Sequence, residues 1–375
     1  MALEHRRAGF FFAWISISTL WSPVETGWVS GSLATGDFAI ESDAIRVIAS
    51  GFAGAALIQA ASGLHKDAVE WPTRIMIAAV AVQAVTVIVC VVFEDAVLAA
   101  LAPISDPHTA MPQNIGRNIN LFALVLPILI GWALAVWRGL SGTVLAIALA
   151  AGFGVLFAAS GVSAALVALL LGALAFLVIA RLSETGLKWL FSALGASILL
   201  APVAFGVLAT SLPVSSLPLS ARSRLFAWRT TIEKISENPW TGHGLGATET
   251  WRATFSDRPE WLAQMTPAFA PFPIVPRHPH NMPLQIWADT GIVGAVLATA
   301  IVVWLGWALP RPATLNWPAR LAAAGVFGAA CTQFFVSYSV WNEAFWASVF
   351  IAGSGVIMLE KRLRRAPAEV PRSAR

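Results

Sequence analysis

Long apolar stretches follow one another along almost the entire chain, and short polar segments separate them. A helix needs about 20 apolar residues to cross a hydrocarbon core of roughly 30 Å. The pattern predicts ten such helices, at residues 9–21, 44–62, 73–93, 119–137, 142–158, 162–181, 188–210, 286–308, 319–339 and 343–359. The first is short and the second has few bulky side chains, so eight or nine spans is the alternative. Hydropathy therefore predicts an all-α, polytopic integral membrane protein.

Composition agrees with this class. Hydrophobic residues make up 57% of the chain and charged residues 12%, and the mean hydropathy is +0.72, whereas about a quarter of the residues of a soluble globular domain are charged. The two cysteines, Cys90 and Cys331, fall inside predicted spans. Neither a disulfide framework nor a metal cluster is predicted.

Basic residues gather in short loops that share one side of the membrane in the ten-span topology. They are Arg6, Arg7, Lys66, Arg74, Arg138, Arg181, Lys188, Arg311, Arg320, Lys361, Arg362, Arg364 and Arg365. Cytoplasmic loops carry an excess of Lys and Arg, so this asymmetry predicts a cytoplasmic (inner) membrane protein with both termini in the cytoplasm. The same rule accounts for the net charge of +4, and no nucleic-acid partner is expected.

Five segments follow from this topology. Residues 1–120 hold the N-terminal spans and outer loops, 121–210 a central block of spans, 211–284 a large periplasmic loop, 285–360 the C-terminal spans and 361–375 a basic cytoplasmic tail. A connection as long as the large loop is usually functional. Apolar residues at helical spacing predict a helix over Ser223–Glu237 that lies in the membrane interface, and Asn238-Pro239 ends it.

Polar and titratable residues gather where the large loop meets the next span. Arg277, His278, His280, Asn281 and Asp289 lie in the stretch RHPHNMPLQIWADTG. Such groups are costly at the mouth of a membrane helix, so they point to a functional site. Earlier in the loop, the alternating glycines at 242, 244 and 246 form a turn whose amides can approach an anion.

Two motifs around these residues carry a family resemblance. His280-Asn281, nine intervening residues, then Gly291 and Gly294 resemble the H-[NSQ]-x9-G-x-x-G signature of the O-antigen ligase and Wzy-type polymerase superfamily of membrane glycan transferases. The run from Arg224 to Gly246 is similar to that family's R-x3-W segment, which leads to P-x-x-G-x-G. Leu20-Trp21-Ser22-Pro23 after the first span is a weaker resemblance to the same family.

The resemblance implies transfer of a glycan from undecaprenyl diphosphate to a hydroxyl of an acceptor glycan, lipid or protein, with no metal ion and no cofactor. The departing diphosphate needs positive charge, which arginine supplies through bidentate hydrogen bonds, so Arg224 and Arg277 are the candidates. The acceptor hydroxyl needs a base, which histidine offers, and His280 is the candidate.

The remaining motif residues are expected to support this chemistry. Asn281 fixes the position of His280, Asp289 pairs with an arginine or orients His280, and Gly291 and Gly294 pack one face of the span. His278 and His243 are interpreted as polar residues without a catalytic role.

One departure from the family pattern keeps other functions open. Where relatives have an arginine in a Ser-Arg-Gly stretch, this chain reads Ser160-Gly161-Val162-Ser163. Arg117 or Arg277 is the substitute nearest in predicted depth. A transporter or flippase would place charges in the middle of its spans, which this sequence almost lacks. A non-catalytic assembly relative is the third alternative.

Overall fold

The computed structural model describes residues 2–24, 42–65, 67–103, 111–137 and 139–364, with side chains from Phe10 onward. Most of the first outer loop, the side chains of Arg6 and Arg7, Lys66, Arg138 and the basic tail beyond Arg364 lie outside the described residues. The orientation assigned from these basic residues therefore stays a prediction.

Helices and short 3-10 turns make up most of the described part of the chain, which contains no strand. The helices are α1 Ala2–Ser18, α2 Asp43–Gly63, α3 Glu70–Val92, α4 Glu94–Leu101, α5 Pro112–Val136, α6 Leu140–Ala159, α7 Ser163–Arg181, α8 Gly186–Leu199, α9 Ala201–Ser211, α10 Leu219–Glu237, α11 Pro259–Leu262, α12 Met282–Ala308, α13 Trp317–Val336 and α14 Glu343–Leu363. The all-α class is confirmed.

Eight of these helices are long and apolar enough to cross a membrane: α2, α3, α5, α6, α7, α12, α13 and α14. The predicted span 188–210 is two helices, α8 and α9, which meet at an angle of 77°. Pro202 in the first turn of α9 has no amide hydrogen to continue the ladder of α8, which favours the break. The apolar helix at Phe10–Trp21 is shorter than a span. The count of ten is thus not confirmed, and eight or nine fits the structure.

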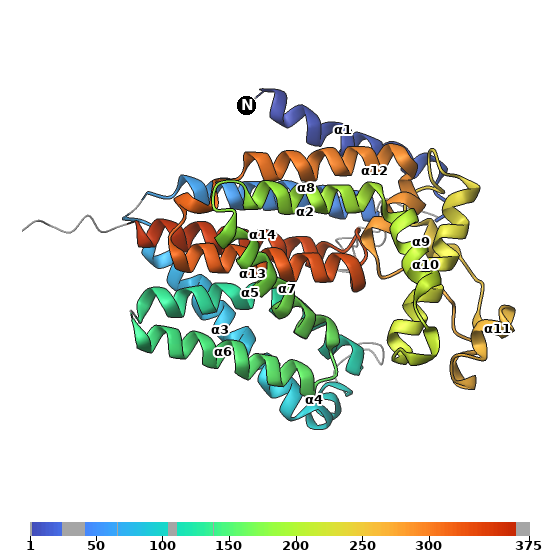
Figure 1. Cartoon of the computed structure of the whole chain (residues 1–375), viewed down its shortest axis with the longest axis horizontal. Coiled ribbons are helices and arrows are strands. Elements are labelled where there is room, and N and C mark those ends of the chain that lie inside the picture. Colours follow the sequence, from blue (N-terminus) through green and yellow to red (C-terminus); the bar gives the residue numbers. More distant parts are fainter. Residues whose placement is uncertain (1, 25–41, 66, 104–110, 138, 365–375) are drawn as a thin grey trace, which may run out of the picture. The chain divides into compact units, whose positions relative to one another are not determined.

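The chain forms two compact units from discontinuous stretches. Unit 1 comprises residues 1–50, 187–309 and 334–343, and unit 2 comprises residues 51–186, 310–333 and 344–375. Figure 1 labels the helices of both units. In unit 1, α8 runs beside α12 (Figure 1), where Thr299 Oγ1 donates to Gly195 O at 3.1 Å.

Small residues let two helices of unit 2 approach closely. A Cβ atom on Gly172 of α7 would lie 3.1 Å from the Cα of Gly325 in α13, and one on Gly328 would lie 2.5 Å from the carbonyl carbon of Leu171. Helices in lipid have no hydrophobic drive to associate, so their association depends on close packing of their backbones. The small-residue pattern of this block therefore has a packing role.

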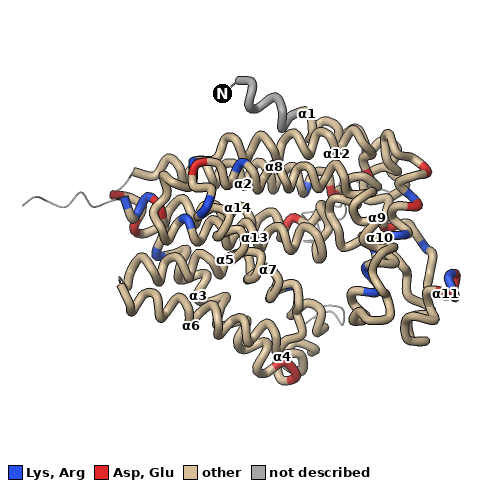
Figure 2. The backbone as a smooth tube through the Cα atoms, viewed as in Figure 1, with Lys and Arg blue, Asp and Glu red and all other residues tan. Residues whose placement is uncertain are grey.

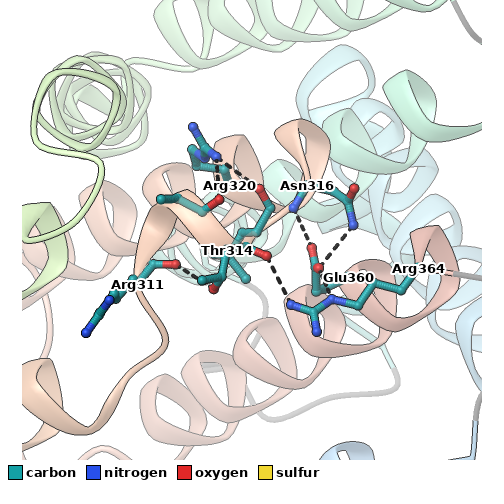
Figure 3. A network of polar contacts seen from close by, with 8 residues as sticks. Arg311, Thr314, Asn316, Arg320, Glu360 and Arg364 are labelled. Carbon is teal, nitrogen blue, oxygen red and sulfur yellow. Dashed lines mark hydrogen bonds and ion pairs between the residues drawn. The ribbon is translucent and has the colours of Figure 1, made fainter.

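A polar network fastens the end of α14 in unit 2, as Figure 3 shows. Glu360 accepts hydrogen bonds from the amide nitrogen of Asn316 at 2.7 Å, from Asn316 Nδ2 at 3.0 Å and from Arg364 Nε at 2.6 Å. Arg364 Nη2 also donates to Thr314 O at 3.0 Å. Figure 2 shows that charged residues concentrate at helix ends and in the α10–α11 segment, while most of the helical length is uncharged.

The helix predicted over 223–237 is present as α10, and its place in the membrane interface stays a prediction. It begins at Leu219 and ends at Glu237, directly before Asn238-Pro239. Leu225, Trp228 and Ile235 are buried, and α10 contacts α9 and α12 within unit 1.

The charge asymmetry predicts that the segment 211–284 faces the periplasm. Thr248 is fully buried, but Ala268 is exposed, so a cysteine introduced at Ala268 is accessible to solvent. We expect Ala268→Cys to react with an impermeant thiol reagent in cells with a permeabilised outer membrane, and Ser373→Cys to react only after lysis. The reverse labelling pattern would invert the topology.

Candidate functional site

Helix α10 places Arg224 and Trp228 one turn apart, and both reach backbone carbonyls far away in the sequence. Arg224 Nε donates to Val336 O at 3.0 Å, and its Nη1 donates to Ser220 O at 2.9 Å. Trp228 Nε1 donates to Pro279 O at 3.1 Å. Burial lowers the pKa of the Arg224 guanidinium, but arginine remains protonated in proteins. The R-x3-W spacing thus fixes a positive charge beside the 277–280 turn.

The turn from Arg277 to His280 has an unusual backbone. Arg277 has a φ of 68° and His280 a φ of 52°, which is the left-handed region that residues other than glycine rarely adopt. Strained conformations of this kind cluster at functional sites. The strain is held by contacts from outside the turn, including Thr248 Oγ1 donating to Arg277 O at 2.7 Å.

The imidazole of His280 is oriented by one backbone carbonyl. Its Nδ1 lies 2.9 Å from Ser337 O. A carbonyl oxygen can only accept, so Nδ1 carries the hydrogen, and in the neutral ring Nε2 keeps its lone pair. His280 is therefore held in the tautomer that a base acting through Nε2 requires.

His278 supports the same turn. The backbone amide of His280 donates to His278 Nδ1 at 3.2 Å, and the two rings lie 4.3 Å apart edge to face. His243 is tied elsewhere, with Nε2 at 2.7 Å from Lys234 O. Of the two histidines interpreted as non-catalytic, His278 is thus a direct neighbour of the candidate base.

Asn281 caps α12, and its side chain bonds in two directions. Its Oδ1 accepts from the amide of Leu284 at 3.0 Å, and its Nδ2 donates to Phe335 O at 3.2 Å. Asparagine is among the preferred N-cap residues, and this one is 0% exposed. The residue after His280 is therefore fixed by both α12 and the last turn of α13.

The glycine turn at 242–246 packs against a break in α12. Gly291 has a φ of 64° and a ψ of −165°, so the helical ladder is interrupted there. A Cβ on Gly291 would lie 2.6 Å from the amide nitrogen of Gly242 and would also overlap Trp240 O, while one on Gly242 would lie 2.6 Å from the amide nitrogen of Gly291. The two motif glycines face each other, and only glycine fits at either position.

Backbone hydrogen bonds cross this contact in both directions. The amide of Ile292 donates to Pro239 O at 2.9 Å. In return the amides of His243 and Gly244 donate to Ala288 O at 2.8 Å and Asp289 O at 3.0 Å. The amides of His243 and Gly244 are therefore occupied by carbonyl oxygens, whereas the amide of Gly246 lies close to the Asp289 carboxylate.

The short motif after the first span joins the same contact. Leu245 O accepts from Ser22 Oγ at 2.5 Å, and a Cβ on Gly244 would lie 2.5 Å from the Cα of Ser22. Trp14 Nε1 donates to Thr290 O at 3.1 Å. The motif Leu20-Trp21-Ser22-Pro23 thus packs against the glycine turn through Ser22.

Asp289 bonds a partner that the sequence did not suggest. It is 0% exposed, and its Oδ2 accepts from Trp341 Nε1 at 2.6 Å. The backbone amides of Gly246 and Thr248 lie close to the same carboxylate. Among the described residues its side-chain partner is thus Trp341 and not an arginine, and a role for Asp289 in orienting His280 stays a prediction.

Arg277 is exposed, and its charge is opposed by a carboxylate. Burial raises the pKa of Glu249, and the charge of Asp43 raises it further, whereas Arg277 and Arg46 lower it. Arg277 therefore lies within electrostatic range of Glu249. Of the two candidate arginines, Arg224 is the one held beside His280 by consecutive carbonyls, at Val336 and Ser337.

Two features of the site were missed from the sequence. One is Gln285, which is 2% exposed and whose Oε1 accepts from the amide of Val340 at 3.0 Å. The other is the segment Phe335–Trp341, here called the strap, which comprises the last two residues of α13 and the connection toward α14. The spacing of Asn281, Gln285 and Asp289 at i, i+4 and i+8 was the available signal, because it places three polar residues on one face of an apolar helix.

The turn that lacks the family arginine lies in unit 2. A Cβ on Gly116 would lie 3.6 Å from Val162 Cγ2, so the neighbouring Arg117 stands at the level of the 160–163 turn. Arg117 is exposed, and its Nη1 donates to Asn114 Oδ1 at 3.0 Å. Arg224, Arg277 and His280 all belong to unit 1.

No group of three or more His, Cys, Asp or Glu side chains in the described part of the chain is arranged to hold a metal ion.

The comparison with protein families found a match that includes this site. Residues 147–299 match the family model described as O-Antigen ligase. The resemblance to that family is thus confirmed. The matched region contains every candidate residue from Arg224 to Gly294 and ends before the strap.

Two curated relatives carry a related name. A "Putative polysaccharide ligase" of Rickettsia conorii (strain ATCC VR-613 / Malish 7) is 35% identical over 83 residues, which is 22% of this chain and 19% of that protein. Another, of Rickettsia felis (strain ATCC VR-1525 / URRWXCal2), is 28% identical over 144 residues, or 38% of this chain and 32% of that protein. The chain thus spans about a fifth and about a third of these relatives. No solved structure matches the chain.

The contact between Gly242 and Gly291 generates a prediction about stability. Gly291→Ala would place a Cβ against the glycine turn and force alanine into a left-handed conformation, so we expect the free energy of unfolding to fall by about 2–4 kcal/mol. Thermal unfolding of the detergent-purified protein measures the change. Gly152→Ala is the control, because a Cβ at Gly152 meets nothing within 4 Å. Equal melting temperatures for the two variants would contradict the packing role.

Proposed function

We propose that this chain is a membrane glycan transferase that moves an oligo- or polysaccharide from undecaprenyl diphosphate to an acceptor hydroxyl. It acts as an O-antigen ligase or as a surface or exopolysaccharide polymerase. The match of residues 147–299 to the O-antigen ligase family supports the reaction class, and eight apolar helices of spanning length support a multi-pass membrane protein.

One observation carries the proposal at atomic level. Arg224 and His280, which are 56 positions apart by their numbers, bond to the consecutive carbonyls of Val336 and Ser337. A fixed positive charge and an oriented imidazole therefore lie side by side at the mouth of an apolar helix. A lipid diphosphate held in the membrane interface presents its anionic group at such a mouth.

The two residues have complementary tasks in the transfer. Nε2 of His280 accepts the proton of the acceptor hydroxyl while that oxygen bonds to the anomeric carbon of the donor sugar. The bond from the anomeric carbon to the diphosphate oxygen breaks, and undecaprenyl diphosphate leaves with the bonding electrons. Arg224 stabilises the negative charge that develops on the leaving group.

The remaining candidates hold this pair in place or add charge. Arg277 supplies a second positive charge at the turn, and the negative charge of the nearby Glu249 partly offsets it. Asn281 fixes the start of α12, and Gly291 and Gly294 serve the packing of that helix. The substrates approach from the periplasmic side of the inner membrane, and the acceptor is a glycan, lipid or protein hydroxyl.

The role of Arg224 predicts that lysine cannot replace it. Lysine offers a point charge in place of the planar fork and loses the Nε bond to Val336 O. We expect Arg224→Lys to reduce glycan transfer about a hundredfold or more, nearly as strongly as Arg224→Ala. Surface polysaccharide in a complemented deletion strain is the measurement, with Arg252→Lys as an exposed control on the same loop. Near-normal output from Arg224→Lys would leave this arginine a packing role only.

The role of His280 predicts a larger defect. General base catalysis contributes about a hundred- to ten-thousand-fold in rate, so His280→Ala should abolish detectable transfer at normal protein levels. His65→Ala is the matched control, because His65 is an exposed histidine in unit 2. Loss of long chains from a lipid anchor indicates a ligase, and accumulation of single repeat units indicates a polymerase. Wild-type polysaccharide from an abundant His280→Ala protein would favour a non-catalytic assembly role.

A further inference from the structure

We propose that the strap holds His280 and Arg224 in their reacting geometry, and that Asp289 and Gln285 are positioning residues that fix the strap against α12. The chemistry of His280 and Arg224 in this proposal rests on the proposed function. The geometry of the strap does not, and it is testable by itself.

Five polar side chains converge on this one segment of unit 1. The contacts join Asn281 Nδ2 to Phe335 O, Arg224 Nε to Val336 O, His280 Nδ1 to Ser337 O, Gln285 Oε1 to the amide of Val340, and Asp289 Oδ2 to Trp341 Nε1. Two of these five belong to the candidate reacting pair. The other three come from the start of α12 and bond the strap before and after that pair.

The strap needs external contacts because of its place in the chain. Phe335 and Val336 end α13, and the last carbonyls of a helix have no partner within it. Asn281 and Arg224 bond these two carbonyls, and a cation at a helix C-terminus is also favoured by the helix dipole. The residues after Val336 are not helical until Glu343, so no helical ladder sets their position.

Contacts from the first turns of α12 set the register of the strap. Asn281, Gln285 and Asp289 lie one turn apart on the same face and are 0%, 2% and 0% exposed. A buried polar group that loses its partner is costly. A shift of the strap by one residue would leave both Gln285 and Asp289 without their partners. These contacts therefore select a single register. Buried polar groups are known to select one register in this way in other proteins.

The register of the strap decides where the two reacting side chains point. Ser337 is four residues from Trp341, and its carbonyl determines which nitrogen of His280 carries the hydrogen. A displacement of about 1 Å at a reacting group can cost up to a hundredfold in rate. The Asp289–Trp341 contact therefore acts on the chemistry through the strap, without itself touching a reacting atom.

The experiment reads the tautomer of His280 directly. Nitrogen-15 spectra of histidine-labelled protein in detergent distinguish the two neutral tautomers, and the His280 signal among the six histidines is the one that disappears in His280→Ala. In the wild-type protein we expect the Nδ1–H form. Trp341→Phe removes the donor to Asp289, and we expect the His280 signal to shift toward the Nε2–H form and transfer to fall about ten- to a hundredfold.

A matched control separates positioning from general stability. Trp287 is also a buried tryptophan of unit 1, and its Nε1 donates to Ile198 O at 2.9 Å, away from the strap. Trp287→Phe should leave the His280 signal and transfer near wild type. Asp289→Asn keeps an acceptor oxygen for Trp341 and should also remain near wild type, whereas Asp289→Leu should resemble Trp341→Phe.

The possible outcomes distinguish this proposal from the proposed function. An unchanged His280 signal in Trp341→Phe overturns the positioning role, whatever the activity. If Trp341→Phe does not accumulate, Gln285→Met is the second probe, because it removes the acceptor for Val340, and an unchanged His280 signal there overturns the proposal equally. A shifted signal supports the strap even if His280→Ala retains full transfer, a result that would reject only the proposed function.

Discussion

The break in α12 at Gly291 is the constraint on which the rest of the site depends. An unbroken helix would pair the carbonyls of Ala288, Asp289 and Thr290 within its own ladder. In this structure they accept from the outer loop and from α1 through the amides of His243 and Gly244 and through Trp14 Nε1. The nine helical residues before the break, 282–290, thus form a separate helical piece, which is too short to be stable alone and is held by these contacts.

That piece carries three polar residues into an apolar environment, and each of them bonds the strap. Asn281, Gln285 and Asp289 are buried, and each bonds the strap. Polar groups inside a membrane protein are expensive unless they are satisfied in this way, and those that persist usually serve function. The mouth of α12 therefore combines a well-packed scaffold with an imidazole and a guanidinium that are only half-buried.

The relation to O-antigen ligases rests on the middle of the chain. The matched residues 147–299 include the R-x3-W helix, the glycine turn and the His-Asn motif. The structure explains why these motifs occur together, since Trp228 bonds the turn before His280 and Gly242 packs on Gly291. The strap, to which both candidate reacting residues bond, lies beyond the match, so its contribution becomes visible only in three dimensions.

Local sequence determined the helical class, most span positions, the end of α10 and the identity of the motif residues. Hydropathy over 20 residues and the 3.6-residue period depend on neighbours along the chain, so they are readable without coordinates. The bend between α8 and α9 was not predicted, because residues 188–210 form one apolar stretch of spanning length and Pro202 was not interpreted as a break in it. Tertiary structure alone decided the partners: Arg224 meets Val336 across 112 positions, and Asp289 meets Trp341 across 52. Such contacts depend on how helices far apart in the sequence pack, and no local spacing encodes that packing.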